Sequence, residues 1–182
     1  HFATAPAPAA APAYAPPPMP AAAPPVASAI PMPGPAATQV TAMAEAAVAF
    51  WNIAHPDDVR HQSYKAVPSA VFSNPQVATV GLTEQEAHRQ GRSFRVGRRD
   101  FSGTAYGWAM GDDTGFAKVL VDDETGLIIG AHVIGPQASS IIQPLIQAMQ
   151  FEQRADDVAR EVLYIHPALT EVIENALLDA LD

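Results

Sequence analysis

The first 44 residues contain no Lys, Arg, Asp or Glu, which limits the part of the chain that can fold. Twelve of the eighteen prolines lie between Pro6 and Pro35, separated mainly by alanine. Such a segment has few side chains to bury and few backbone N–H groups to pair, so we expect residues 1–37 to be disordered or PPII-like. A folded core must therefore come from residues 38–182, and the tract before it could act as a tether.

Hydrophobic periodicity predicts one helix, then a group of strands, then a group of helices. A helical stripe begins after Thr38 and ends at His55-Pro56, and Thr83 is placed to cap a short helix that Gly91 closes. Alternating apolar residues predict strands at 67–73, 76–82, 93–101, 115–121 and 127–134, and helical spacing returns at 141–149, 156–162 and 169–180. This order predicts an α+β domain, with an antiparallel sheet packed with helices.

Two segments give no clear prediction. Gly103–Met110 fits either a helical turn or irregular structure. Pro144 falls inside the predicted helix at 141–149, where it would remove a hydrogen bond and clash with the Ser140 carbonyl. The cost would be about 3 kcal/mol unless the helix starts late or kinks.

Charge and composition exclude several classes of function. The net charge of −9 disfavours nucleic acid and anionic membranes as partners, because both bind clustered Lys and Arg. The sequence has no uninterrupted apolar run of about 18 residues and no basic segment leading into an apolar one, so we expect a cytoplasmic protein. The absence of cysteine excludes a disulfide framework, a thiolate metal site and a redox-active dithiol within these residues.

The strongest candidate for chemistry is the motif formed by His166, Pro167 and Glu171. Proline disfavours helical geometry in the residue before it, so His166 is predicted to be the N-cap of the helix that follows. Glu171 lies off the apolar stripe of that helix, and its carboxylate could orient one ring nitrogen. The spacing alone favours the simpler interpretation, a histidine that caps the helix and a solvated glutamate.

Other polar residues are interpreted as structural. His132 lies in an apolar strand and is expected to be hydrogen-bonded there rather than to bind a metal, since no companion ligands accompany it. His55 and His61 flank a predicted loop and are expected on the surface. The acidic turn at 122–124 lacks the alternating ligands of a calcium loop and is expected to be solvated.

Four motifs in the same order resemble the C-terminal dimerisation domain of the pyridine nucleotide-disulfide oxidoreductases. They are Val67–Pro75, Val80–Glu84, Gly130–Pro136, and His166-Pro167 with Glu171. The resemblance covers residues 38–182: the segment at 38–64 is similar to the end of the family's FAD domain, and residues 65–182 to its dimerisation domain. Residues 105–110 and 164–169 look most like the mycothione reductase branch, with dihydrolipoamide dehydrogenases next.

The resemblance implies an active site shared between two subunits. In this family NADPH or NADH reduces FAD, the flavin reduces a cysteine pair, and the dithiol attacks a small disulfide substrate. His166 would be the general acid/base supplied across a homodimer, Glu171 would orient it, and His166 with Pro167 would lie against the partner subunit's flavin.

The sequence also departs from the complete family pattern. It has no cysteine pair and no Gly-x-Gly-x-x-Gly fingerprint, so FAD and NAD(P)H are expected in the complete enzyme but not bound by this chain alone, which is expected to be inactive by itself. A fragment of such an enzyme and a non-catalytic dimerisation module on a tether both remain open. In either case we expect an exposed apolar patch on the helix at 38–54 and the sheet face beneath it.

Overall fold

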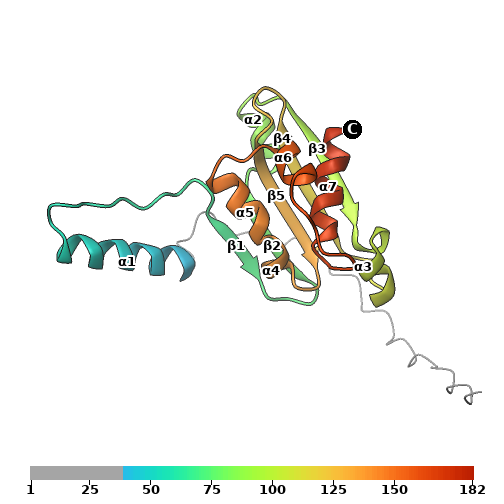
Figure 1. Ribbon diagram of the computed structural model, residues 1–182, viewed down its shortest axis with the longest axis horizontal. Coiled ribbons are helices and arrows are strands. Elements are labelled where there is room, and N and C mark those ends of the chain that lie inside the picture. Colours follow the sequence, from blue (N-terminus) through green and yellow to red (C-terminus); the bar gives the residue numbers. More distant parts are fainter. Residues whose placement is uncertain (1–38) are drawn as a thin grey trace, which may run out of the picture. The chain divides into compact units, whose positions relative to one another are not determined.

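The computed structural model describes residues 39–182, so the Ala/Pro tract and the predicted cap Thr38 lie outside the described residues. A helix, α1 (Gln39–Ala54), is followed by a long connection into a domain of strands and helices (Figure 1). Its elements are β1 (Pro68–Val71), β2 (Gln76–Gly81), α2 (Glu84–Arg89), β3 (Phe94–Asp100), a 3-10 turn (Phe101–Gly103), α3 (Ala105–Met110), β4 (Phe116–Asp122), β5 (Ile128–Gly135), α4 (Ala138–Ile141), α5 (Gln143–Gln150), α6 (Ala155–Arg160) and α7 (Glu171–Leu181).

The five strands form one antiparallel sheet in the order β1-β2-β5-β4-β3. The central strand β5 pairs on both sides, so that Val133 lies opposite Ala78 of β2 and Ala117 of β4. The predicted cap of α2 is present, because the Thr83 side chain accepts a hydrogen bond from Glu86 N at 3.1 Å. The predicted fold class is confirmed.

Helices α4 to α7 cover one face of the sheet and bury the main core (Figure 1). The apolar stripe predicted for the last helix is buried at Val172, Ile173, Ala176, Leu177 and Ala180. A smaller cluster of Ala87, Leu120 and Ile129 forms where α2 packs. The C-terminal helix is therefore a core element, and its first residue, Glu171, is held in place by that packing.

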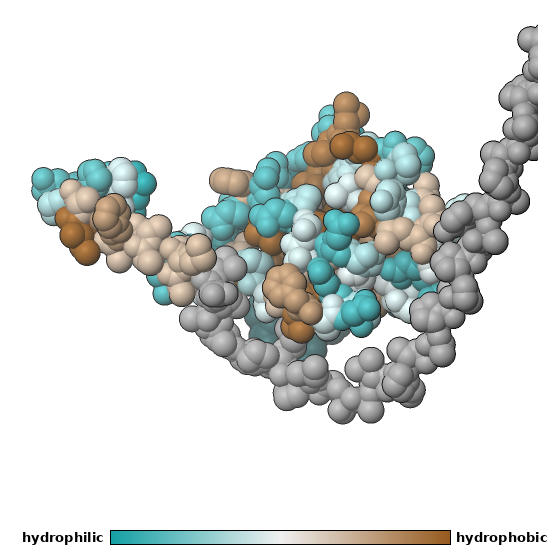
Figure 2. All heavy atoms as spheres, turned by 90° about the horizontal axis from the view of Figure 1, so that it is seen from below, coloured by the Kyte–Doolittle hydropathy of each residue, from teal (hydrophilic) through white to brown (hydrophobic). Residues whose placement is uncertain are grey.

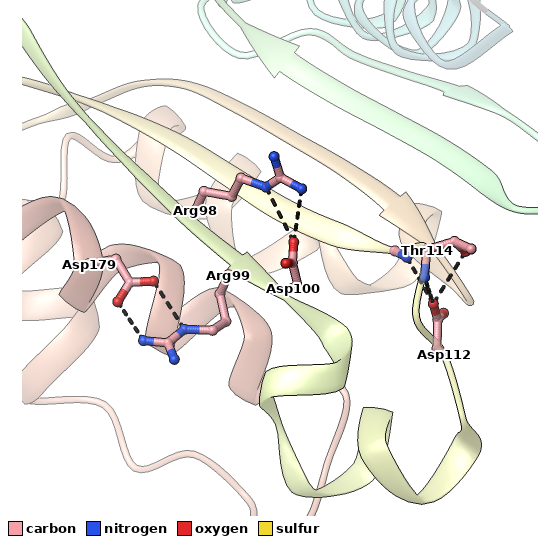
Figure 3. A network of polar contacts seen from close by, with 7 residues as sticks. Arg98, Arg99, Asp100, Asp112, Thr114 and Asp179 are labelled. Atoms are coloured by element: carbon pink, nitrogen blue, oxygen red, sulfur yellow. Dashed lines mark hydrogen bonds and ion pairs between the residues drawn. The ribbon is translucent and has the colours of Figure 1, made fainter.

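Helix α7 lies unusually close to the edge strand β3. A Cβ atom added at Gly97 would meet Ala176 O at 1.9 Å and Ala180 N at 2.6 Å, so only glycine allows this approach. Beside it, Arg99 Nε donates to Asp179 Oδ2 at 3.0 Å and its Nη2 to Asp179 Oδ1, which makes a two-pronged ion pair between β3 and α7 (Figure 3). Backbone contact and charge pairing therefore fix the position of α7 together.

The two ambiguous segments both contain helices. Residues after Gly103 form α3, which Thr104 caps by accepting a hydrogen bond from Gly107 N at 3.2 Å. The single helix predicted at 141–149 is divided into α4 and α5, and Pro144 occupies the first turn of α5. Proline costs little there because the first N–H groups of a helix have no intrahelical partner.

Helix α1 carries large apolar side chains that remain exposed, at 73% for Met43, 75% for Phe50 and 82% for Ile53. Hydrophobic surface is visible on α1 in Figure 2. The helical part of the expected apolar patch is therefore present. Among the residues that the structure describes, no helix is long and apolar enough to cross a membrane.

Candidate active-site loop

The loop at 161–170 joins α6 to α7 and carries His166 near its middle. The His166-Pro167 peptide bond is cis. The prediction that His166 caps the helix was wrong, since α7 begins at Glu171 and its N-cap is Thr170. A turn separates the two: Glu171 N and Val172 N each donate at 3.3 Å, to Ala168 O and Leu169 O respectively, before regular helical bonding begins.

His166 and Glu171 meet across this turn. His166 Nδ1 lies 2.6 Å from Glu171 Oε1, and Ala168 N donates to Glu171 Oε2 at 2.9 Å. One carboxylate thus binds both the imidazole and the backbone of the loop that carries it. The alternative of a solvated glutamate was therefore wrong, because the Glu171 side chain is only 12% exposed.

The electrostatic environment keeps Glu171 ionised. Burial alone would raise the pKa of Glu171, but the hydrogen bonds from His166 and Ala168 N and the charge of His166 outweigh burial and lower it. An ionised carboxylate can only accept hydrogen bonds, so Nδ1 of His166 must carry the proton that is shared with Oε1. This leaves Nε2 as the ring nitrogen available to an outside group.

The two members of the pair differ in access to solvent. The His166 side chain is 70% exposed, and the neighbouring Pro167 is also exposed. An imidazole with one nitrogen held by a largely covered carboxylate and the other open to solvent has the arrangement of a general acid/base. The loop can therefore present a proton donor and acceptor to a molecule that docks against it.

His132, His55 and His61 lie where they were expected. His132 is half-buried, with Nδ1 2.7 Å from Thr79 Oγ1 and Nε2 3.1 Å from Leu82 O, so it is hydrogen-bonded within the sheet as predicted. His55 and His61 are exposed, and His55 stacks on Trp51 with ring centroids 3.9 Å apart. Among residues 39–182, no group of three or more His, Asp or Glu side chains is placed to hold a metal ion.

The acidic turn between β4 and β5 was predicted to be solvated, and this prediction was wrong for Asp122. Asp122 is 5% exposed, and its Oδ1 accepts hydrogen bonds from Thr125 N at 2.9 Å and Thr125 Oγ1 at 2.8 Å. The hydrogen bond from Thr125 N is the largest influence on the pKa of Asp122, which is lowered although burial opposes the change. This carboxylate closes the hairpin and is not a ligand site.

Sequence reasoning missed the second bond of Glu171. The signal was present, because a glutamate three residues after an unpaired N–H can reach back to it, as the N3 glutamate of a capping box does. It was overlooked because the helix was predicted to begin at Pro167 rather than at Glu171.

Comparison with known proteins assigns the fold and this loop to a family. The sequence profile of the pyridine nucleotide-disulphide oxidoreductase dimerisation domain matches residues 67–177. The chain belongs to this family, and the matched residues are its dimerisation domain. The predicted resemblance is confirmed.

Individual relatives come from two branches. Mycothione reductase of Mycobacterium tuberculosis is 51% identical over 115 residues, which is 63% of this chain and 25% of that protein. Dihydrolipoyl dehydrogenase of Rhizobium etli is 37% identical over 136 residues, 75% of this chain and 28% of that protein. The chain thus spans about a quarter of the length of these curated relatives.

Solved structures share the same architecture. LpdA from Mycobacterium tuberculosis aligns with a TM-score of 0.64 at 25% identity, over 70% of this chain and 28% of that one. The HOCl-induced flavoprotein disulfide reductase RclA from Escherichia coli aligns with a TM-score of 0.70 at 21% identity, over 76% of this chain and 32% of that one. The second likeness supports the fold alone.

Proposed function

We propose that this chain is the interface domain of an FAD-dependent NAD(P)H disulfide reductase like mycothione reductase, and that it supplies His166 and Glu171 to the active site of a partner subunit. The observation that carries the proposal is the 2.6 Å contact between a largely covered, ionised carboxylate and an exposed imidazole. The relationship to mycothione reductase gives this pair its chemical setting.

The chemistry required of the pair is proton transfer during thiol–disulfide exchange. Attack of a thiolate on a disulfide releases a second thiolate, which leaves more readily as a thiol once it gains a proton. His166 in its protonated form donates the Nε2 proton to the leaving sulfur and becomes neutral. When Nε2 later takes a proton from the attacking thiol, the Glu171 carboxylate stabilises the imidazolium.

The residues of this chain fit a contact with a flavin but not a complete nucleotide site. His166 and Pro167 are both exposed and adjacent, so they can lie against the partner subunit's FAD. The sequence contains no cysteine and no glycine fingerprint for a dinucleotide phosphate. Bound FAD and NAD(P)H would supply the electrons, and this chain would contribute the proton and the homodimer surface.

A second candidate is an interface domain of a dihydrolipoyl dehydrogenase-like enzyme. The observation that favours it is the longer alignment, 136 residues, with the Rhizobium etli protein. The two candidates use the same acid/base pair and differ in the disulfide that is reduced, so an assay of substrate choice separates them.

The test is rescue in a mixed dimer. The chain is co-expressed with mycothione reductase, or with dihydrolipoyl dehydrogenase, in which the corresponding histidine has been replaced by alanine. We expect this chain to restore NAD(P)H-dependent reduction of mycothione by the first partner and to restore little activity of the second with its dihydrolipoyl substrate. Failure with both partners, although mixed dimers form, would identify the chain as a non-catalytic dimerisation module.

A further inference from the structure

The loop that carries His166 has few side chains holding it to the domain. From Glu161 to Pro167, all of which the structure describes, Tyr164 is the one residue that is not exposed. Its neighbours Leu163 and Ile165 are 97% and 76% exposed. The attachment of this half of the loop therefore depends on the side chain of Tyr164.

Tyr164 is bound to the end of α6. Its hydroxyl donates to Val158 O at 3.2 Å, and Val158 itself is 5% exposed. Val158 O belongs to the last four carbonyls of the helix, which have no intrahelical donor. The tyrosine thus satisfies a carbonyl that the helix leaves open and ties the loop to a buried part of the core.

The hydroxyl of Tyr164 remains a donor over the whole working range of pH. Burial, followed by the negative charge of Glu174 on α7, raises the pKa of Tyr164 to about 12. A half-buried ring near both α6 and α7 with a permanently protonated hydroxyl is a stable anchor between the two helices.

A second anchor lies on the other side of His166. Ala168 N is bound by Glu171 Oε2, and Leu169 is 9% exposed. His166 is therefore two residues after one anchor and two residues before the other. The downstream anchor and the imidazole use the same carboxylate, whereas the Tyr164 hydroxyl holds the backbone on the upstream side of His166.

We propose that Tyr164 is a positioning residue for the His166–Glu171 pair, which it acts on by holding the backbone of the loop against α6. The inference rests on the proposed function, because it assigns Tyr164 a part in presenting the acid/base. Small displacements of a catalytic group lower rates by large factors, so an anchor two residues away affects the site without touching substrate.

The test measures the tautomer of the His166 imidazole in the full chain. Two-bond ¹H–¹⁵N correlation spectra of protein labelled at histidine report which ring nitrogen of neutral His166 carries the proton, and His166→Ala identifies its signal. We expect the Nδ1–H form in the wild type. In Y164F the tautomer ratio should move toward Nε2–H by about fivefold, the typical effect of one lost hydrogen bond.

The matched control is Y64F. The Tyr64 hydroxyl also donates a hydrogen bond, to Glu45 Oε1 at 2.7 Å, but it belongs to the connection before β1. Y64F should leave the His166 tautomer unchanged. If Y164F lowers the melting temperature but leaves the tautomer ratio at its wild-type value, Tyr164 is merely structural and the inference is overturned.

This measurement is independent of catalysis. A tautomer shift in Y164F without any rescue in the mixed dimers rejects the proposed function and keeps the anchoring role of Tyr164. Rescue of activity together with an unshifted tautomer rejects the anchoring role and keeps the proposed function.

Discussion

At the scale of single residues, Glu171 couples the candidate site to stability. Its folded pKa lies below the ordinary value of 4.5, so the stability that it contributes is present above pH 4.5 and is lost as the pH falls through the lowered pKa. In E171Q the amide can still accept from Ala168 N, but the charge-assisted bond to His166 is lost. We expect a loss of about 1 kcal/mol at neutral pH and a weaker dependence of stability on pH below 4.5.

Urea unfolding at about pH 7 and about pH 3.5 measures both effects. E174Q is the control, because Glu174 lies in the first turn of the same helix but is not the carboxylate bound to His166. An E171Q protein as stable as the wild type, with the same acid limb, would show that the His166–Glu171 contact contributes nothing to the fold.

We expect His132 to make the stability of the fold depend on pH in a different pH range. Burial, supported by the charge of Lys118, lowers its pKa below 6.5, although the bond to Leu82 O and the charge of Glu84 act in the opposite direction. The folded state therefore resists protonation of His132, and stability is lost as the pH falls below 6.5. Glutamine can keep both hydrogen bonds without a charge, so H132Q should lose less stability than the wild type between about pH 7 and pH 5.5. Equal losses in urea unfolding would contradict this role.

The contact of His166 with Glu171 and the internal bonding of His132 were within reach of prediction, because residue type and spacing limit which groups are able to meet. The start of α7 could not, because proline permits a helix to begin but does not require it, and the turn at 168–170 depends on the Glu171 side chain reaching back to Ala168 N. No sequence pattern indicated a role for Tyr164, since its bond to Val158 O depends on the path of the loop.

At the scale of elements, the contact of β3 with α7 decides where the site lies. In G97A the new methyl group would overlap the backbone of α7 at Ala176 and Ala180, so the helix must move. We expect a loss of about 1–3 kcal/mol in the free energy of unfolding, together with a change in the His166 signals, because α7 begins at Glu171.

The control for this prediction is G103A, since a Cβ atom at Gly103 would meet only the Arg99 side chain, at 3.3 Å. Unfolding by urea and the histidine spectra of the two variants can be compared directly. A G97A protein with wild-type stability would mean that α7 does not pack on β3 as closely as described.

The order of elements was predictable because each strand and helix is amphipathic with a distinct period. The junctions between these elements were harder to predict. Pro144 predicted an interruption of the helix at 141–149. Whether it would cause a kink or begin a new helix depends on how Ile141, Ile142 and Leu145 pack in the core, where all three are at most 3% exposed.

At the scale of the whole molecule, the proposed function gives this chain one half of a composite site. The described domain holds the His166–Glu171 pair on an exposed loop, and the sequence has no cysteine. Helix α1 carries exposed apolar residues, and larger patches of this kind are typical of contact surfaces between proteins. These features agree with a domain that acts only in a dimer with a flavin-bearing chain.

The role of His166 is tested most directly by the turnover of mixed dimers in which this chain is paired with histidine-deficient mycothione reductase. This chain is present as wild type, as H166A and as H61A. Removal of a general acid/base typically lowers kcat by about 10²–10⁴-fold, so H166A should abolish most of the rescued activity. H61A, which removes an exposed loop histidine, should keep it. Equal turnover with H166A and the wild-type chain would contradict the assignment of His166 as the acid/base.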